Sequence, residues 1–281
     1  MPLAGVGGGE SMNKFDAADQ LSLWLSQPLC RFYAAGIFSA ATVQVTGADD
    51  TQNQAVHWAL GCMGGGELEL LGAWNEQGQG AVAHASLVAD LEIRGVESMR
   101  ALVGTDLGDV VSTSRSRVLF DATELPSVER TLAAILPQVE PCYRRALANA
   151  FRAVLVAGRG RAVDAAMSVA EAGPLGERYA PLVAQWRALM SRWAPVFELP
   201  VAQRRLVLAG DRLAADLHKG LVRAIARHGP FTDSAAALGF VARALQRVER
   251  RLDRKPAACR AAVGRRARRL GIAGRLAVAG G

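Results

Sequence analysis

The stretch LLGAWNEQGQGAVAHASLVADLEIRGVE, Leu70–Glu97, changes from a strand pattern to a helix pattern across one glycine-containing loop. Its first part belongs to the apolar run Glu67–Trp74, which predicts a β-strand. From Ala81 to Ile93, apolar residues recur at helical spacing and predict a helix. A strand that leads directly into a helix is typical of α/β proteins.

Two more strands are predicted before this stretch. The segments Gly36–Val45 and Ala55–Cys62 are apolar, and Thr46–Asn53 between them has the composition of a hairpin turn. Three glycines at positions 64–66 then separate the second strand from the third. No Lys-Ser or Lys-Thr pair follows these glycines, so we interpret them as a turn rather than a phosphate-binding loop.

The rest of the chain completes an α/β layer pattern. Ala101–Val103 and Arg117–Phe120 are two further strand candidates, each followed closely by an aspartate, Asp106 or Asp121. From Ser127 onward nearly the whole chain is predicted to be helical. The predicted helices cover residues 128–136, 142–156, 162–172, 181–193, 202–228 and 234–251.

The positive charge is concentrated in the C-terminal region. The chain of 281 residues has a formal net charge of +7, but residues 241–281 alone contain 12 Lys or Arg against Glu249 and Asp253. A basic tail can bind polyanions independently of the fold. No apolar stretch reaches membrane-spanning length, and residues 1–10 do not resemble a secretory signal, so we expect a cytoplasmic protein.

The cysteines, tryptophans and histidines are predicted to be structural. Four cysteines are widely spaced and do not cluster with the four histidines, so a zinc site is not expected, and the thiols, Cys142 included, are expected to be reduced and mostly buried. The tryptophans have apolar neighbours and are expected in the core. His218 and His228 are expected on a solvated helix face.

Five short stretches occur in the order found in Mutator-type bacterial insertion-sequence transposases, and the chain resembles that family over roughly residues 24–245. The most specific is the opening stretch, Leu70–Glu97. The others are Trp24 with Pro28 and Leu29; Glu140, Pro141 and Cys142; Tyr179–Pro200 followed by Arg204 and Arg205; and Gly229 with Phe231. The family's His three residues after the cysteine is replaced here by Arg145.

The resemblance implies a ribonuclease-H-like core with a large helical insertion and a helical C-terminal part. We expect this core at residues 16–251, the insertion at about residues 143–203, a disordered segment at 1–15 and a basic low-complexity tail at 252–281. The family's helical DNA-binding region before the core is expected to be mostly missing. The family uses two Asp and one Glu to hold divalent metal, and Mg²⁺ is the expected cofactor because it prefers carboxylate oxygens.

The acidic residues of the family are only partly matched. Ser39 stands at the position of the first Asp. The final Glu falls on Ala215 when counted back from Gly229, or on Ala214 when counted forward from Arg204. Asp216 is adjacent but would project about 100° away around a helix. Asp49 and Asp50 lie in the hairpin turn and are not expected to replace the missing residue.

The middle aspartate is ambiguous between Asp106 and Asp121. Counting from Arg94 and Gly95 favours Asp106, whereas counting back from Cys142 favours Asp121. With their partners missing, we interpret both as structural cap or turn residues in preference to metal ligands.

The sequence therefore predicts a transposase-like protein, for cutting and joining DNA ends, with impaired catalysis. The alternative is a non-enzymatic DNA-binding remnant that acts through Arg265, Arg266, Arg268 and Arg269 in the tail, or a decayed gene product without function. DNA is the expected partner, assembly into a homo-oligomer is left open, and no membrane contact is expected.

Overall fold

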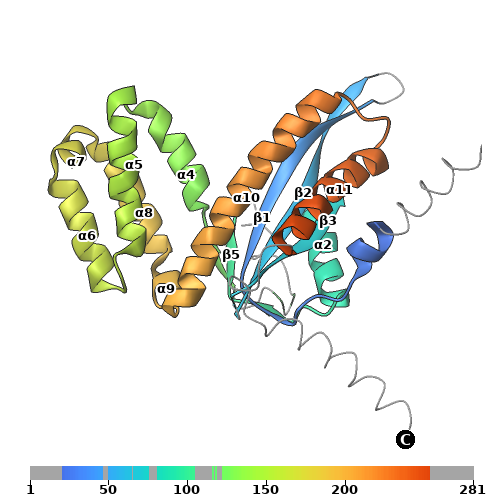
Figure 1. The fold of residues 1–281 in the computed structure, drawn as a ribbon, viewed down its shortest axis with the longest axis horizontal. Coiled ribbons are helices and arrows are strands. Elements are labelled where there is room, and N and C mark those ends of the chain that lie inside the picture. Colours follow the sequence, from blue (N-terminus) through green and yellow to red (C-terminus); the bar gives the residue numbers. More distant parts are fainter. Residues whose placement is uncertain are drawn as a thin grey trace, which may run out of the picture.

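The computed structural model describes residues 21–46, 50–64, 66–75, 81–104, 116, 118 and 122–253, with the backbone alone for 81–85 and 251–253. These residues form an α/β structure in which helices flank a mixed sheet (Figure 1). Three long strands, β1 (Phe32–Thr46), β2 (Thr51–Met63) and β3 (Leu68–Asn75), pair in antiparallel fashion. They confirm the three predicted strands; parts of the two predicted turns between them, residues 47–49 and 65, lie outside the described residues.

Short strands extend the sheet on the other side of β1. β5 (Ala101–Val103) and β6 (Thr123–Leu125) run parallel to β1, and the order across the sheet is β3-β2-β1-β5-β6. A two-residue strand, β4 (Ser98–Met99), pairs with the start of β1. The prediction of β5 is confirmed.

The predicted strand at Arg117–Phe120 lies outside the described residues except for Val118. The strand beside β5 is instead β6, which the sequence did not predict. Its three residues, Thr-Glu-Leu, are too few to show the apolar alternation by which a strand is found in a sequence.

The helices agree closely with the predicted ranges. They are α2 (Ala81–Ile93), α4 (Val128–Ile135) with the 3-10 turn η1 (Leu136–Gln138), α5 (Pro141–Val156), α6 (Arg161–Ala172), α7 (Pro174–Arg178), α8 (Ala180–Arg192), α9 (Ala194–Phe197), α10 (Val201–His228) and α11 (Ser234–Asp253). Only the short α7 and α9 were not predicted. At the start of the described chain, residues 21–26 are also helical.

Helices cover both faces of the sheet (Figure 1). On one face, Leu87 and Leu91 of α2 belong to the same apolar cluster as Phe38 and Leu71 of the strands. On the other face, α10 lies over β1 and α11 lies over β3, above a larger apolar cluster that includes Trp58. Successive side chains of a strand point to opposite faces, which explains why one strand contributes to both clusters.

The helices α5, α6, α7 and α8 pack on one another to one side of the sheet (Figure 1). Phe151 of α5 stacks on Trp186 of α8 with ring centroids 4.6 Å apart. Trp24, Trp58, Trp186 and Trp193 are buried, as expected, and Trp74 is half-buried.

The expectation of a buried Cys142 is wrong. Cys142 lies exposed in the first turn of α5, whose buried side is formed by Leu147, Phe151 and Val154. Leu147 lies five positions after Cys142 in the helix, so the two side chains point about 140° apart. Of the other described cysteines, only Cys62 is buried, and Cys30 is half-buried.

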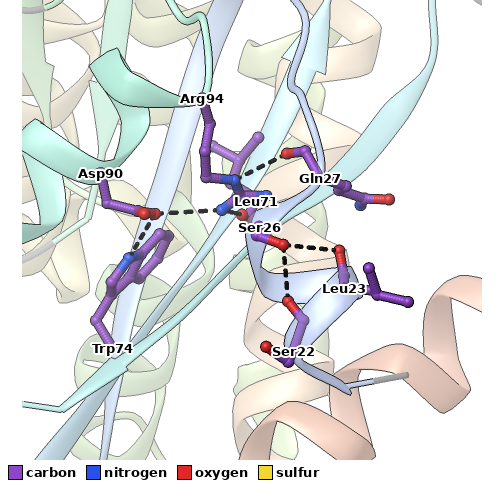
Figure 2. Close-up of polar contacts among 8 residues, drawn as sticks. All are labelled: Ser22, Leu23, Ser26, Gln27, Leu71, Trp74, Asp90 and Arg94. Carbon is purple, nitrogen blue, oxygen red and sulfur yellow. Dashed lines mark hydrogen bonds and ion pairs between the residues drawn. The ribbon is translucent and has the colours of Figure 1, made fainter. Parts of the chain in front are cut away.

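Arg94 joins α2 to β3 and to the chain before β1 (Figure 2). Its buried guanidinium donates hydrogen bonds to the carbonyl oxygens of Gln27, at 2.9 Å, and Leu71, at 2.5 Å, and to the Asp90 carboxylate at 3.3 Å. Asp90 also accepts a hydrogen bond from the Trp74 indole. This Arg94 cluster therefore holds the stretch Leu70–Glu97 together as one unit.

Candidate active site

Ser39 is a polar residue in an apolar row on β1. The row faces α10 and contains Ile37, Ala41 and Val43, all of them buried. Ser39 is half-buried, and across the β1–β2 pair it lies opposite Trp58. Because side chains alternate along a strand, Ser39 also faces α10.

The side of α10 that meets β1 carries Gly210, Asp211, Ala214 and His218, which follow one another at helical spacing. Ser39 Oγ lies 3.3 Å from His218 Nδ1. A β-carbon at Gly210 would come within 2.6 Å of the Ile37 side chain and 2.8 Å of the Cys62 sulfur. The missing side chain at Gly210 therefore lets α10 approach the sheet closely.

Of the two alanines considered for the final acidic position, Ala214 is the one that faces the sheet. Ala214 is 5 % exposed and lies one helical turn before His218, whereas Ala215 is half-buried. Asp216 is exposed, as expected for a residue that projects away from the sheet. A side chain at position 214, but not at 215, would be directed toward Ser39.

The expectation that His218 lies on a solvated helix face is wrong. It is half-buried between α10 and β1. Burial lowers its pKa, and the positive charge of Arg130 on α4 lowers it further. The ring is therefore biased toward its neutral form. His228, in contrast, is exposed, and its ring stacks on Phe231.

Asp211 is a buried carboxylate that sequence reasoning missed. It is 1 % exposed and accepts a hydrogen bond from the backbone N–H of Glu129 at 3.0 Å. Burial raises its pKa, while hydrogen bonds from the Ser127 hydroxyl and from the backbone at Glu129 and Val128 act in the opposite direction. Asp211 thus ties α10 to the first turn of α4. The sequence offered one signal for Asp211: it lies three residues before Ala214, and residues three apart share one side of a helix.

The described residues at this place do not fit a pair of Mg²⁺ ions. Ser39 is neutral, Ala214 has no donor, and the described part of the chain holds no group of three His, Cys, Asp or Glu side chains able to bind a metal. Mg²⁺ prefers several hard, charged oxygen ligands. Asp50 is exposed at the far end of β1: the next residue, Thr51, pairs with Thr46, about 23 Å along the strand from Ser39.

Other predicted site residues lie outside the described residues: Asp106, Asp121, Asp49, Arg265, Arg266, Arg268 and Arg269. The described residues next to Asp106 and next to Asp121 lie at opposite ends of the parallel strands. Gly104, two residues before Asp106, follows the carboxyl end of β5 and lies beside the Phe38 carbonyl oxygen. Ala122, next to Asp121, precedes β6 at the opposite end of the parallel strands.

Residues 12–253 match the family model described as transposase, Mutator family. The chain belongs to the Mutator family of transposases. It is 26% identical over 234 residues to the transposase for insertion sequence element ISRM3 of Rhizobium meliloti (strain 1021), a match that covers 83% of this chain and 58% of that protein. It is also 26% identical over 225 residues to a probable insertion-sequence transposase of Corynebacterium diphtheriae, which covers 78% of this chain and 64% of the relative. The chain thus spans about six tenths of the length of these relatives.

In this transposase-family chain, the Gly-x-Phe stretch after α10 has a structural role. Gly229 ends α10 with a φ of 79°, a conformation that favours glycine. Phe231 is buried, and its backbone exchanges hydrogen bonds with β1: its N–H donates to the Gln44 carbonyl and its carbonyl accepts from the Thr46 N–H, both at 2.8 Å. The stretch therefore anchors the end of α10 over β1.

No helix in the described part of the chain combines the length and apolar character needed to cross a membrane.

Proposed function

We propose that this chain is a transposase core with a ribonuclease-H-like fold in which the family's reaction, metal-dependent cutting and joining of DNA ends, is lost or strongly impaired. The observation that carries the proposal is that neither Ser39 on β1 nor Ala214 on the buried side of α10 is a carboxylate, while Asp211, the buried carboxylate on that side of α10, bonds to the start of α4. Three antiparallel strands, a helix and two strands parallel to the first support the fold assignment.

We further propose that α5 to α9, which extend from Pro141 to Phe197, form the helical insertion expected at about residues 143–203. In chain order, these helices follow β6 and α4 and precede α10, which covers the sheet. The helices α5 to α8 contact one another beside the sheet. The core would then run from residue 16 to residue 251, with the basic tail at 252–281.

The chemical basis of the impairment is electrostatic. In-line cleavage of a phosphodiester needs one metal ion to activate the attacking oxygen and another to stabilise the leaving oxygen. The charge of two divalent cations must be balanced by carboxylates, and neither the Ser39 hydroxyl nor the His218 ring supplies a negative charge. His218 and Ser39 instead bond to each other across the place where the acidic side chains would meet.

Between the two candidates for the middle aspartate, we propose Asp106. It follows Gly104, which lies next to Phe38 and therefore one residue from Ser39 along β1. Asp121 precedes Ala122 at the other end of the parallel strands. Catalytic carboxylates have to lie within a few ångströms of shared metal ions, which favours the residue nearer to Ser39.

The test is nicking of supercoiled plasmid DNA with Mg²⁺ or Mn²⁺. We compare the original chain with Ser39→Asp/Ala214→Glu and, as a matched control, with Ser39→Asp/Ala215→Glu. The expected result is no nicking by the original chain, nicking by the 214 form, and none by the 215 form, because position 215 is turned away from β1. Adding Asp106→Ala should abolish the restored activity, whereas adding Asp121→Ala should not.

Nicking by the original chain that disappears in Asp106→Ala or Asp121→Ala would show that a working metal site survives, and would overturn the proposed impairment. Activity in the 215 form but not in the 214 form would overturn the position assigned to the missing glutamate.

A further inference from the structure

The solvent side of α10 carries a stripe of positive charge. Five basic side chains of this 28-residue helix are exposed and recur at positions that lie on one side of a helix, within about 40° of a common line. The stripe consists of Arg205, Arg212, Lys219, Arg223 and Arg227, and the same side contains one carboxylate, Asp216. We call these five residues the α10 stripe.

The α10 stripe lies opposite the candidate active site. Ala214 follows Arg205 by nine residues, which corresponds to about 180° around a helix. Ala214 is buried against the sheet and Arg205 is exposed. A polyanion bound to the stripe is therefore separated from Ala214 and His218 by the whole thickness of the helix, about 10 Å.

The charges of the stripe are not neutralised within the described residues. Arginines elsewhere in the described chain form ion pairs, such as Arg178 with Glu140 and Arg187 with Glu171. None of the five stripe residues forms an ion pair with a described carboxylate. Arg223 and Arg227 donate from Nε to backbone carbonyls one turn back along α10, of Lys219 and Arg223. Their terminal nitrogens are thus left to bind an external anion.

We propose that the α10 stripe binds the phosphate backbone of duplex DNA at a place distinct from the position where the family's carboxylates would act on a strand. From Arg205 to Arg227 the helix rises about 33 Å, close to one turn of B-form DNA. The stripe contains no aromatic residue for stacking on unpaired bases. The apolar side of α10 is buried on the sheet and is not available to insert into a lipid surface.

The inference rests on the proposed function only in the choice of DNA as the polyanion. It predicts contacts to phosphates rather than to base edges, so binding should be independent of sequence and should weaken steeply with salt. DNA held on the stripe would be a segment other than the one presented to Ser39. The stripe also differs from the basic tail, because it is displayed on a folded helix.

The test is the affinity of the full chain for a labelled duplex of about 30 base pairs, or roughly three helical turns, measured by fluorescence anisotropy over a range of salt concentrations. The stripe variant is Arg212→Gln/Lys219→Gln/Arg223→Gln. The matched control is Arg145→Gln/Arg161→Gln/Arg192→Gln, which removes three exposed arginines from α5, α6 and α8. Thermal unfolding of both variants checks that the fold is unchanged.

The stripe variant should bind about tenfold or more weakly at low salt, and the slope of log K against log salt should fall by about 2 to 3. The control should change the affinity by less than about twofold. Asp216→Asn, which removes the negative charge within the stripe, should bind more tightly than the original chain.

An equal affinity of the stripe variant and the control would overturn the inference and assign DNA binding to the tail or to another surface. A stripe-dependent affinity for single-stranded DNA or phosphatidylserine vesicles that matches that for the duplex would overturn the choice of duplex DNA. Nicking by Ser39→Asp/Ala214→Glu is measured separately, so failure of the stripe and failure of the proposed function give different results.

Discussion

The Arg94 cluster and the Ser39 site each join a helix to the sheet through polar side chains, but they differ in the number of hydrogen bonds that they make. The buried Arg94 makes two hydrogen bonds to carbonyl oxygens and an ion pair with Asp90. Ser39 makes a single contact at 3.3 Å, to the half-buried and preferentially neutral ring of His218. Arg94 therefore supplies hydrogen-bond donors to backbone carbonyl groups, whereas the contact of Ser39 joins two side chains only.

Folding depends more on the Arg94 contacts than on the Ser39 contact. Removing Arg94 would leave the buried Leu71 carbonyl and the half-buried Gln27 carbonyl without this partner, which costs stability. Several carboxylates that converge between a strand and a helix repel one another unless metal ions are bound, so they are a burden on the folded state. Under the proposed function, Ser39 and Ala214 stand where such carboxylates would repel one another. Their replacement would then leave intact the contacts that build the fold, such as those of Arg94.

The largest effect on stability is expected from Arg94→Ala. It removes the hydrogen bonds to Gln27 and Leu71 and leaves Asp90 without its cation, so the free energy of unfolding should fall by about 3 to 4 kcal/mol. Urea denaturation measures the change. The exposed Arg100→Ala is the control and should stay within about 0.5 kcal/mol of the original chain. A loss below about 1 kcal/mol for Arg94→Ala would contradict the structural role of the cluster.

Asp211→Ala should have the next largest effect. It leaves the N–H of Glu129 and the Ser127 hydroxyl without their acceptor at the start of α4, and should cost about 2 to 3 kcal/mol of unfolding free energy. Asp211→Asn should cost less, because it keeps an acceptor and removes a buried charge. The exposed Asp216→Ala serves as control in the same denaturation experiment. Asp211 has no structural role if both alanine variants behave alike.

Ser39→Ala should change stability by less than about 1 kcal/mol. The hydroxyl is half-buried, its contact to His218 is long, and both partners are uncharged in the favoured state. The loss of unfolding free energy is compared with that of Arg94→Ala under identical denaturation conditions, and should be several times smaller. A loss of 2 kcal/mol or more at Ser39 would mean that the contact between β1 and α10 depends on this hydroxyl, and would break the contrast.

The smallest effect is a dependence of stability on pH through His218. Because burial and Arg130 lower its pKa in the folded chain, the contribution of His218 to stability is complete above the ordinary value of 6.5 and declines as the pH falls below it. His218→Gln should flatten that decline. Ser39→Asp places a negative charge beside the ring and should raise the pKa of His218, as measured by its NMR titration. A titration midpoint of the original chain above 6.5 would contradict the described burial.

Most of the fold was predictable because its signals are local. The three long strands and the helices α2, α4, α5, α6, α8, α10 and α11 carry periodic apolar patterns over eight residues or more. The strand β6 has three residues and no such pattern, so it was missed. The short α7 and α9 were missed for the same reason.

The candidate site was predictable only in part. Ser39 and the pair Ala214 and Ala215 were found by counting along motifs, but counting left two alternatives open. The orientation of α10 on the sheet shows that Ala214 faces β1, because a rotation of one residue moves a side chain by about 100°. Asp211 was overlooked and His218 was wrongly expected on a solvated face, because their partners, on α4 and β1, are distant in sequence.

The α/β class and the resemblance to Mutator-family transposases follow from the sequence, and so does the prediction that Ser39 and either Ala214 or Ala215 occupy acidic positions of the family. These properties follow from residue identity and from patterns that repeat within a few residues. The tertiary structure alone decided that Ser39 meets His218, 179 residues away, and that one side of α10 is buried while the other displays the stripe. Such contacts depend on how α10 is rotated against the sheet, and that rotation is set by packing at Gly210 and by the anchor at Phe231 rather than by any local preference.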